Sequence, residues 1–311
     1  MRNIRPKLLI STMMILPHLL ISQSAGNQHI ATIVYLDSVV VKATQSGFSV
    51  EDFIEMVQKD QSFYAAFRNL RTSSYIMETD MKFEGRKPRQ NTYYQATHKQ
   101  SYRFPCRELG LLKEDKGKRF RRNNGKNRYY TSELYERLFA REGVFCDSMT
   151  DERIAEGFAD ERGHIGELKR LLFSPGESSN VPFIGKKTAI FSERMADYYD
   201  FEIRSEPWED NREAFVFNVK VKPEYLDRKE NHTVIKQLST YFDRENWQVL
   251  CRKYRLQHKN ALFHFDVLME IRLEKEGDKY FPEKISYQGD WNIPTKRREI
   301  GSFSLDFSEF K

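Results

Sequence analysis

The residue types that usually carry enzyme chemistry occur in this sequence without the spacing that such chemistry needs. It contains no glycine-rich phosphate loop, no Gly-x-Ser-x-Gly nucleophile motif and no His-Glu-x-x-His metal motif. His258 and His264 lie six positions apart across an expected turn, which is not a metal-ligand spacing. We therefore expect no enzyme, no cofactor and no metal site, and we interpret the two histidines as surface or packing residues.

The three cysteines indicate at most one structural bridge. They lack the Cys-x-x-Cys spacing of redox or metal sites, and the first of them, Cys106, lies too far along the chain to be the acylated cysteine of a bacterial lipoprotein. An odd count leaves at least one thiol free or paired with another chain. If one disulfide forms, we expect it between Cys106 and Cys146, because both have loop-like surroundings. Cys251 lies inside an expected strand and is interpreted as a small buried residue.

Residues 113–128 form the most basic stretch, with eight Lys or Arg against two acidic residues. They surround Asn123-Asn124-Gly125, which is a hairpin-turn signal. A solvated protruding hairpin is the plainer interpretation; the alternative is a patch that attracts the phosphates of lipid head groups or lipopolysaccharide. Nucleic acid is not an expected partner, because no recognition motif accompanies the charges. The candidate residues of this basic patch are Lys118, Arg119, Arg121 and Arg122.

Residues 1–25 have the pattern of a secretory signal peptide. Three basic residues precede an apolar run over residues 8–21, and small residues at Ser24 and Ala25 offer a cleavage site. Cleavage would lower the formal net charge from +6 to +3, because Arg2, Arg5 and Lys7 would leave with no acidic residue. We expect an exported protein of the periplasm or the outer-membrane periphery; an uncleaved membrane anchor is the alternative.

Residues 26–47 are expected to form an extended N-terminal segment. Within it, residues 35–43 are a β-branched run, which is typical of an edge strand or an exposed extended peptide. The run also resembles the valine-rich segments near the start of TonB-dependent outer-membrane receptors.

The clearest pattern in the chain is a strand-like alternation in its last third. From residue 263 to residue 273 every second side chain is apolar, and the positions between them are polar or charged except for Leu268. Residues 215–221 and 303–307 repeat the alternation. Short segments at 243–246, 258–260, 276–278 and 289–292 contain Asp, Asn or Gly and are predicted to be turns. These features predict long antiparallel strands with one apolar face.

Amphipathic helices are predicted before and between the strands. Ser49 and Asp52 form a capping box for a first helix, and Asp60 can cap a second one, within residues 50–70. Further helices are predicted at about residues 131–173. We therefore predict an α+β protein, with a single domain over residues 48–311 in which a long antiparallel up-and-down sheet curls into a half-barrel and amphipathic helices cover its concave face.

This arrangement resembles the periplasmic lipoprotein carriers and receptors of the LolA and LolB superfamily. The resemblance is one of architecture and is carried by residues 50–70, 75–83, 263–273, 284–287 and 303–307. In that family a hydrophobic concave face beneath a helical lid receives acyl chains. The resemblance implies a non-enzymatic protein that holds or carries a lipid at the bacterial cell envelope, with a lipid or acyl chain as its partner.

The alternation and the helical stripes supply the candidate residues for such a site. The lipid-facing candidates are Phe215, Phe217, Phe263, Phe265, Val267, Met269, Ile271, Phe303 and Leu305. The lid candidates are Phe53, Ile54, Phe67, Leu168 and Leu172.

A second functional class fits the same sequence. In it the helices fill the concave face completely, and the protein is a structural or assembly module of the outer membrane that contacts an envelope protein. The basic residues 113–128 and 296–298, together with the extended residues 35–43, favour this alternative.

Overall fold

The computed structural model describes residues 48–85, 87, 90–146, 171, 173, 175–178, 185–209, 212–226, 232–259, 264–292 and 298–311. The chain divides into two compact units, Met1–Ile30 and Ala31–Lys311, and all described residues belong to the second. The predicted signal peptide and extended N-terminal segment, Phe263, Leu168 and Leu172 lie outside the described residues.

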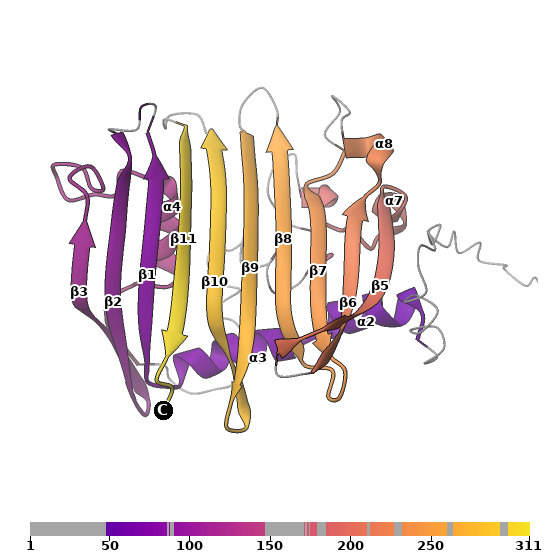
Figure 1. Cartoon of the computed structure of the whole chain (residues 1–311), viewed down its shortest axis with the longest axis horizontal. Coiled ribbons are helices and arrows are strands. Elements are labelled where there is room, and N and C mark those ends of the chain that lie inside the picture. The colour runs from indigo at the N-terminus through magenta and orange to yellow at the C-terminus, as the bar shows by residue number, and fades with distance from the viewer. Residues whose placement is uncertain are drawn as a thin grey trace, which may run out of the picture. The chain divides into compact units, whose positions relative to one another are not determined.

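Eleven antiparallel strands form a single sheet (Figure 1). Across it the strands follow the order β4-β3-β2-β1-β11-β10-β9-β8-β7-β6-β5. Two meanders are thus joined where the first strand pairs with the last, and the sheet is curled and not closed, since its described outer strands β4 and β5 are not neighbours. The strands are β1 (Tyr75–Glu84), β2 (Thr92–Arg103), β3 (Cys106–Lys116), β4 (Gly143–Cys146), β5 (Tyr199–Pro207), β6 (Glu213–Val221), β7 (Ile235–Asp243), β8 (Val249–Lys259), β9 (His264–Glu276), β10 (Lys279–Asn292) and β11 (Glu299–Ser308).

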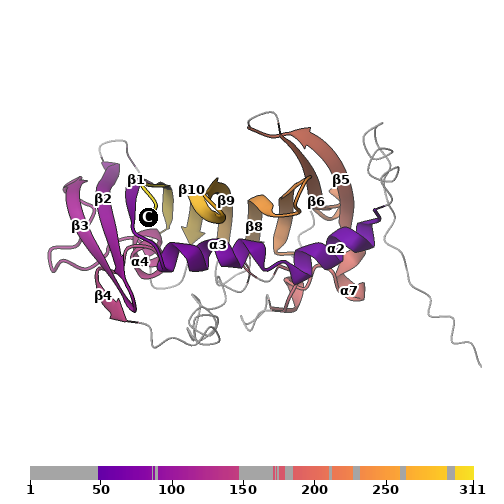
Figure 2. The same ribbon diagram turned by 90° about the horizontal axis from the view of Figure 1, so that it is seen from below.

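The described helices are few. Three have at least nine residues: α2 (Val50–Lys59), α3 (Ser62–Arg71) and α4 (Tyr130–Leu138). Shorter turns are η2 (Gly185–Lys187), α7 (Glu193–Ala196) and α8 (Pro223–Leu226). Figure 2 shows α2 and α3 one after the other along one side of the sheet. The predicted capping box is present, because the Ser49 hydroxyl accepts from the Asp52 amide and the Asp52 carboxylate accepts from the Ser49 amide.

Strand β9 alternates as its sequence predicts, whereas β6 is buried on both faces, because Val216 and Asn218 are buried as well as Phe217. In β9 the side chains of Phe265, Val267, Ile271 and Leu273 are buried, and β9 lies in the interior of the sheet between β8 and β10. The inward-facing residues of β1 and β11 are buried in the same way. Phe53 of α2 packs against Phe217 of β6, and Tyr135 of α4 packs against Phe303 of β11. We call the side of the sheet that carries these inward-facing residues the apolar face.

Two predictions about local structure are wrong. Residues 143–146, expected within a helical region, form β4, because pairing with β3 aligns Cys146 with Cys106. Residues 289–292, expected to be a turn, continue β10 to Asn292. Gly289 serves a different purpose there: a Cβ at this position would collide with the Tyr287 hydroxyl and would lie 2.8 Å from the indole nitrogen of Trp291, so the glycine leaves space for both side chains.

A buried ion pair fastens the junction of α2 and α3 to the sheet. The Asp60 carboxylate accepts hydrogen bonds from the backbone amides of Ser62 and Phe63 at the start of α3, as its predicted capping role requires. It also lies 2.7 Å from a guanidinium nitrogen of Arg252 on β8, whose side chain is fully buried. The guanidinium in turn lies over the ring of Phe63. One arginine therefore holds both helices on the apolar face.

Candidate functional site

A continuous row of large apolar side chains crosses the apolar face. The strand register places one such residue on each of nine neighbouring strands, and all except Met269 are no more than 6% exposed. In order from β2 to β5 they are Tyr94, Met81, Phe303, Tyr287, Met269, Tyr254, Leu238, Val219 and Phe201. The row gives the sheet a hydrophobic floor that runs across its width.

The structure brings the described lipid-facing candidates onto this one face. All are buried except Met269, and Phe263 lies outside the described residues. Those on β6 are covered by protein: the Phe53 ring stacks on Phe217 at 5.7 Å, and Trp247 stacks on Phe215 at 5.3 Å. The apolar face is therefore filled at the α2 end of the sheet.

Met269 is different from its neighbours. It points to the apolar face between buried Val267 and Ile271, yet its side chain is only partly buried. Its register partners Tyr287 and Tyr254 are 4% and 3% exposed. Burial raises the pKa of the Tyr254 hydroxyl to about 12, and it raises the pKa of Tyr287 as well, so both hydroxyls stay neutral. Met269 is thus a partly exposed apolar side chain within the floor, and it adjoins neutral side chains.

Helix α3 crosses from β8 to β10, the two neighbours of β9. On the α3 side, the Phe67 ring is 7% exposed and lies 5.0 Å from Phe173, and α3 is tied to β10 by a hydrogen bond from the Asn69 side chain to the Tyr280 carbonyl. Ile54 of α2 is partly buried against the same core, whereas the lid candidates Leu168 and Leu172 lie outside the described residues.

On the other side, α4 covers β1 and β11. The Tyr135 hydroxyl lies 2.9 Å from the Thr79 hydroxyl on β1, and the Tyr135 and Phe139 rings pack against Phe303. The helix start is capped from far along the chain, because the buried Glu299 carboxylate accepts from the Thr131 amide at 2.8 Å and from its hydroxyl at 2.7 Å. A helix that covers the floor is therefore held in place by a residue far along the chain.

A group of basic side chains lies at one end of the apolar face and was not predicted. Lys236 is 9% exposed and His258 is 2% exposed, on the adjacent strands β7 and β8, and the charge of the partly buried Lys187 of η2 acts on both. Burial lowers the pKa of His258 to about 4, with Lys187 and Lys236 acting in the same direction. The sequence holds one signal for this group, since His258 alternates with Leu256 and Tyr254 on the inward-facing side of β8.

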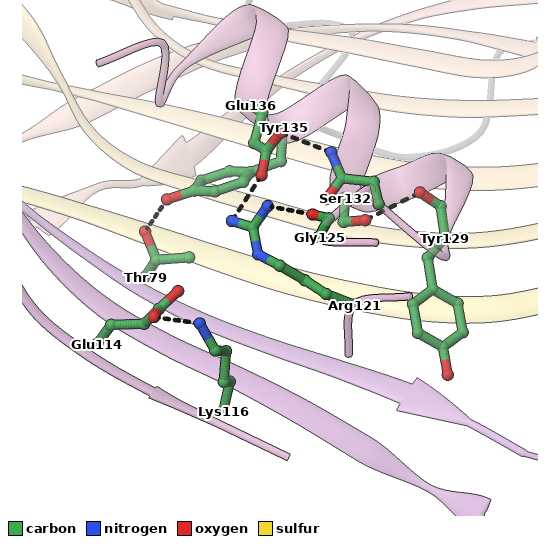
Figure 3. A network of polar contacts seen from close by, with 10 residues as sticks. Thr79, Glu114, Lys116, Arg121, Gly125, Tyr129, Ser132, Tyr135 and Glu136 are labelled. Carbon is green, nitrogen blue, oxygen red and sulfur yellow. Dashed lines mark hydrogen bonds and ion pairs between the residues drawn. The ribbon is translucent and has the colours of Figure 1, made fainter. Parts of the chain in front are cut away.

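The predicted basic patch is divided by the structure. Figure 3 shows that Arg121 pairs with Glu136 of α4 at 2.9 Å and donates to the Gly125 carbonyl, so this arginine holds the turn against the helix. Lys118, Arg119 and Arg122 are exposed and form no ion pair with any described residue. Only these three remain available for a partner.

The polar face of the sheet carries a hollow of about 840 Å³. Residues of six neighbouring strands, from β2 to β8, line it. Charges of both signs meet there and are partly paired, as in Arg255 with Asp266 and Arg298 with Asp290. The hollow thus lacks the single-sign charge of the basic group on the apolar face.

The structure joins Cys106 and Cys146 in a disulfide that links β3 to β4. Cys251 is buried with a free thiol, and burial raises its pKa to about 12, so the thiol is unreactive near neutral pH. No helix among the described residues has the length and apolar character to cross a membrane. In the same described part, no three His, Cys, Asp or Glu side chains gather as a metal site would require.

Comparison with known proteins finds similarity only in structure. No protein-family profile matches the sequence, and the search of curated proteins gives no match. A putative outer membrane lipoprotein-sorting protein domain from Vibrio parahaemolyticus is similar at 10% identity and a TM-score of 0.27, over 81% of this chain and 92% of that one. A LolA superfamily protein from Nitrosomonas europaea is similar at 9% identity and a TM-score of 0.23, over 81% of this chain and 94% of that one. A DUF1329 family protein from Desulfovibrio piger is similar at 12% identity and a TM-score of 0.22, over 80% and 91%.

Proposed function

We propose that this protein is an exported, non-enzymatic binding protein that holds an acyl chain or a similar lipid against the apolar face of its sheet. In this proposal the apolar face is the concave one, and α2 and α3 form the lid together with the described Phe173, which packs against Phe67. The observation that carries the proposal is Met269, which is partly exposed in the middle of a face whose other floor residues are buried.

Burial by a flexible apolar ligand would remove the Met269 side chain from water, which is favourable for an apolar group. Each methylene group that a ligand buries is worth about 0.8 kcal/mol, and the unbranched thioether of methionine adapts to irregular shapes. The neutral hydroxyls of Tyr254 and Tyr287 beside it offer no charge that a hydrocarbon chain would have to desolvate. Holding or transport therefore fits this site better than turnover.

The proposal is tested by lipid binding in a matched pair of variants. Met269→Gln changes the apolar face, whereas Leu268→Gln changes the next residue, which is 44% exposed and points to the other face. We expect Met269→Gln to weaken binding of the fluorescent probe N-phenylnaphthylamine at least about fivefold, since burying an amide without a partner costs about 1–3 kcal/mol. Leu268→Gln should bind like the wild type.

Native mass spectrometry of protein purified from the periplasm provides the second measurement. We expect wild-type protein to carry a lipid adduct that Met269→Gln reduces, with both variants retaining the wild-type circular dichroism spectrum. A wild-type protein that carries no lipid and takes up no probe would overturn the proposal.

A second candidate function, a structural or assembly module of the cell envelope, is favoured by a different surface. Phe104, Leu112 and Val144 are 69%, 60% and 62% exposed on or beside β3 and β4, and the available cations Lys118, Arg119 and Arg122 follow the end of β3. Such a surface suits an acidic, partly apolar protein partner. If this is the function, Arg119→Glu with Arg122→Glu should abolish cross-linking of the protein in whole cell envelopes while lipid binding stays unchanged.

A further inference from the structure

Strand β7 begins and β8 ends at the upper edge of the sheet in Figure 1. The basic residues Lys236 and His258 lie at these strand ends, and the charge of a third, Lys187, acts on both. The register of β7 against β8 shifts between Ile235 and Gln237, so Lys236 is the extra residue of a β-bulge, a device that re-aims a side chain. His258 follows Tyr254 and Leu256 on the apolar face, and Lys187 comes from η2. Buried lysine is rare, so this group needs an explanation.

The positive charges of Lys187 and Lys236 repel each other. The Lys236 ammonium donates to the Thr233 carbonyl at 3.1 Å and to the Thr233 hydroxyl at 2.9 Å, and forms no ion pair with another described residue. Burial lowers the pKa of Lys236, and Lys187 and Arg255 add to the effect, while Asp266 opposes it. Burial also lowers the pKa of Lys187, with Arg194 acting in the same direction. A bound anion would relieve this repulsion.

The basic group adjoins the apolar floor. The His258 ring lies 5.9 Å from Phe265, and the Phe265 ring lies 5.2 Å from Trp291. From Phe265 the inward-facing residues of β9 continue through Val267 to Met269, a distance of about 13 Å at the rise of a β-strand. A row of apolar side chains on β9 therefore links the basic group to the partly exposed Met269.

We propose that the ligand is an anionic amphiphile whose carboxylate or phosphate head binds at Lys187, Lys236 and His258 while its hydrocarbon chain lies along Val267 toward Met269. This inference rests on the proposed function and names the chemical class of its ligand. Lys187 and Lys236 supply positive charge, and the neutral imidazole of His258 supplies a hydrogen-bond donor. The strand register pairs His258 with Phe265, and Met269 lies further along β9, so the head group binds near Phe265 and the hydrocarbon chain extends toward Met269.

The test compares three ligands that share one hydrocarbon chain. Hexadecanoic acid, hexadecyl phosphate and hexadecanol are each used to displace N-phenylnaphthylamine from the delipidated mature protein. We expect the wild type to bind the acid or the phosphate about tenfold or more tightly than the alcohol, as charge-assisted hydrogen bonds require. Which of the two anions binds more tightly identifies the head group as a carboxylate or a phosphate.

Substituting the two lysines then tests whether they cause the preference for an anionic head group. Lys187→Met combined with Lys236→Met should reduce the preference for the anion to about twofold or less and leave hexadecanol affinity unchanged, since the methionines keep the apolar bulk. Lys259→Met is the matched control, because Lys259 is exposed and follows His258 on the opposite side of β8. It should retain the full preference. If the double variant does not fold, Lys187→Met alone, at a less buried position, makes the same comparison.

The outcomes separate this inference from the proposed function. Equal wild-type affinity for hexadecanol and both anions, or an unchanged preference in the lysine variants, would overturn the inference and leave acyl-chain binding intact. Failure of the wild type to bind the probe or any of the three amphiphiles would overturn both.

Discussion

At the scale of single residues, buried polar side chains hold the covering helices in place. Arg252 is fully buried, pairs with Asp60 and lies over Phe63, while Asp60 also accepts from the first amides of α3. A charge buried this deeply is stable only with its partner, because removing one member leaves the other desolvated and unpaired. The ion pair therefore specifies where α2 ends and α3 begins on the sheet.

Replacing Arg252 by Met should destabilise the fold by about 3–5 kcal/mol, because the Asp60 carboxylate would remain buried without its cation. Chemical denaturation measures the change. The double variant Arg252→Met with Asp60→Ala should cost less than the sum of the two single changes, since the stranded charge is then gone. Strict additivity of the two changes would show that the side chains act independently.

At the scale of elements, α4 depends on a strand far away in sequence. Its N-cap residue Tyr129 makes no side-chain capping bond, and the Glu299 carboxylate at the start of β11 takes that role. Negative charge at a helix N-terminus satisfies amides that the helix leaves unpaired. The position of α4 over β1 and β11 thus follows from the pairing of β11.

Glu299→Gln should destabilise the protein by about 1–3 kcal/mol and increase hydrogen exchange in α4, because an amide replaces one of the two carboxylate oxygens that accept from the helix start. The matched control is Glu133→Gln in the first turn of the same helix, whose exposed ion pair with Arg137 predicts a loss of about 0.5 kcal/mol or less. Comparable losses in the two variants, measured by denaturation and hydrogen exchange, would contradict the capping role.

At the scale of the whole described unit, β11 joins two groups of strands. On one side lie β1 to β4, and on the other lie β10 back to β5. Leu305 is fully buried and pairs with Thr79 on β1 and with Ile285 on β10. Neither group can complete its hydrogen-bond ladder without the last strand of the chain, so we expect them to unfold together.

Leu305→Ala should cost about 2–5 kcal/mol, as expected for a large-to-small change in a packed core. The effect can be followed on both sides of β11, because all three tryptophans lie at positions 208, 247 and 291, on the β5 to β10 side, and hydrogen exchange in β2 reports the other side. Both probes should shift to the same new midpoint. Ile300→Ala, at a 39% exposed position of the same strand, should shift neither by much. Separate midpoints would show two independently folding parts.

Much of the local structure could be predicted because its signals are local. The capping box at Ser49 and the alternation over β9 follow from residues a few positions apart, and both are present. The prediction of a turn at 289–292 was wrong, because glycine is a local turn signal but has another role here. Gly289 leaves space for the side chains of Tyr287 and Trp291, and only the packed structure reveals this requirement.

By itself the sequence determined the one-sided strands, the amphipathic helices and the absence of enzyme motifs, since each depends on residue type and short spacing. The tertiary structure decided which inward-facing residues are covered and that Glu299 caps α4. It also decided that the charges of Lys187 and Lys236 act on His258. Alternation assigns every second side chain to a face but cannot say what lies above it. Strand register and the bulge at Lys236 set those contacts, and they arise only when segments distant in sequence pair.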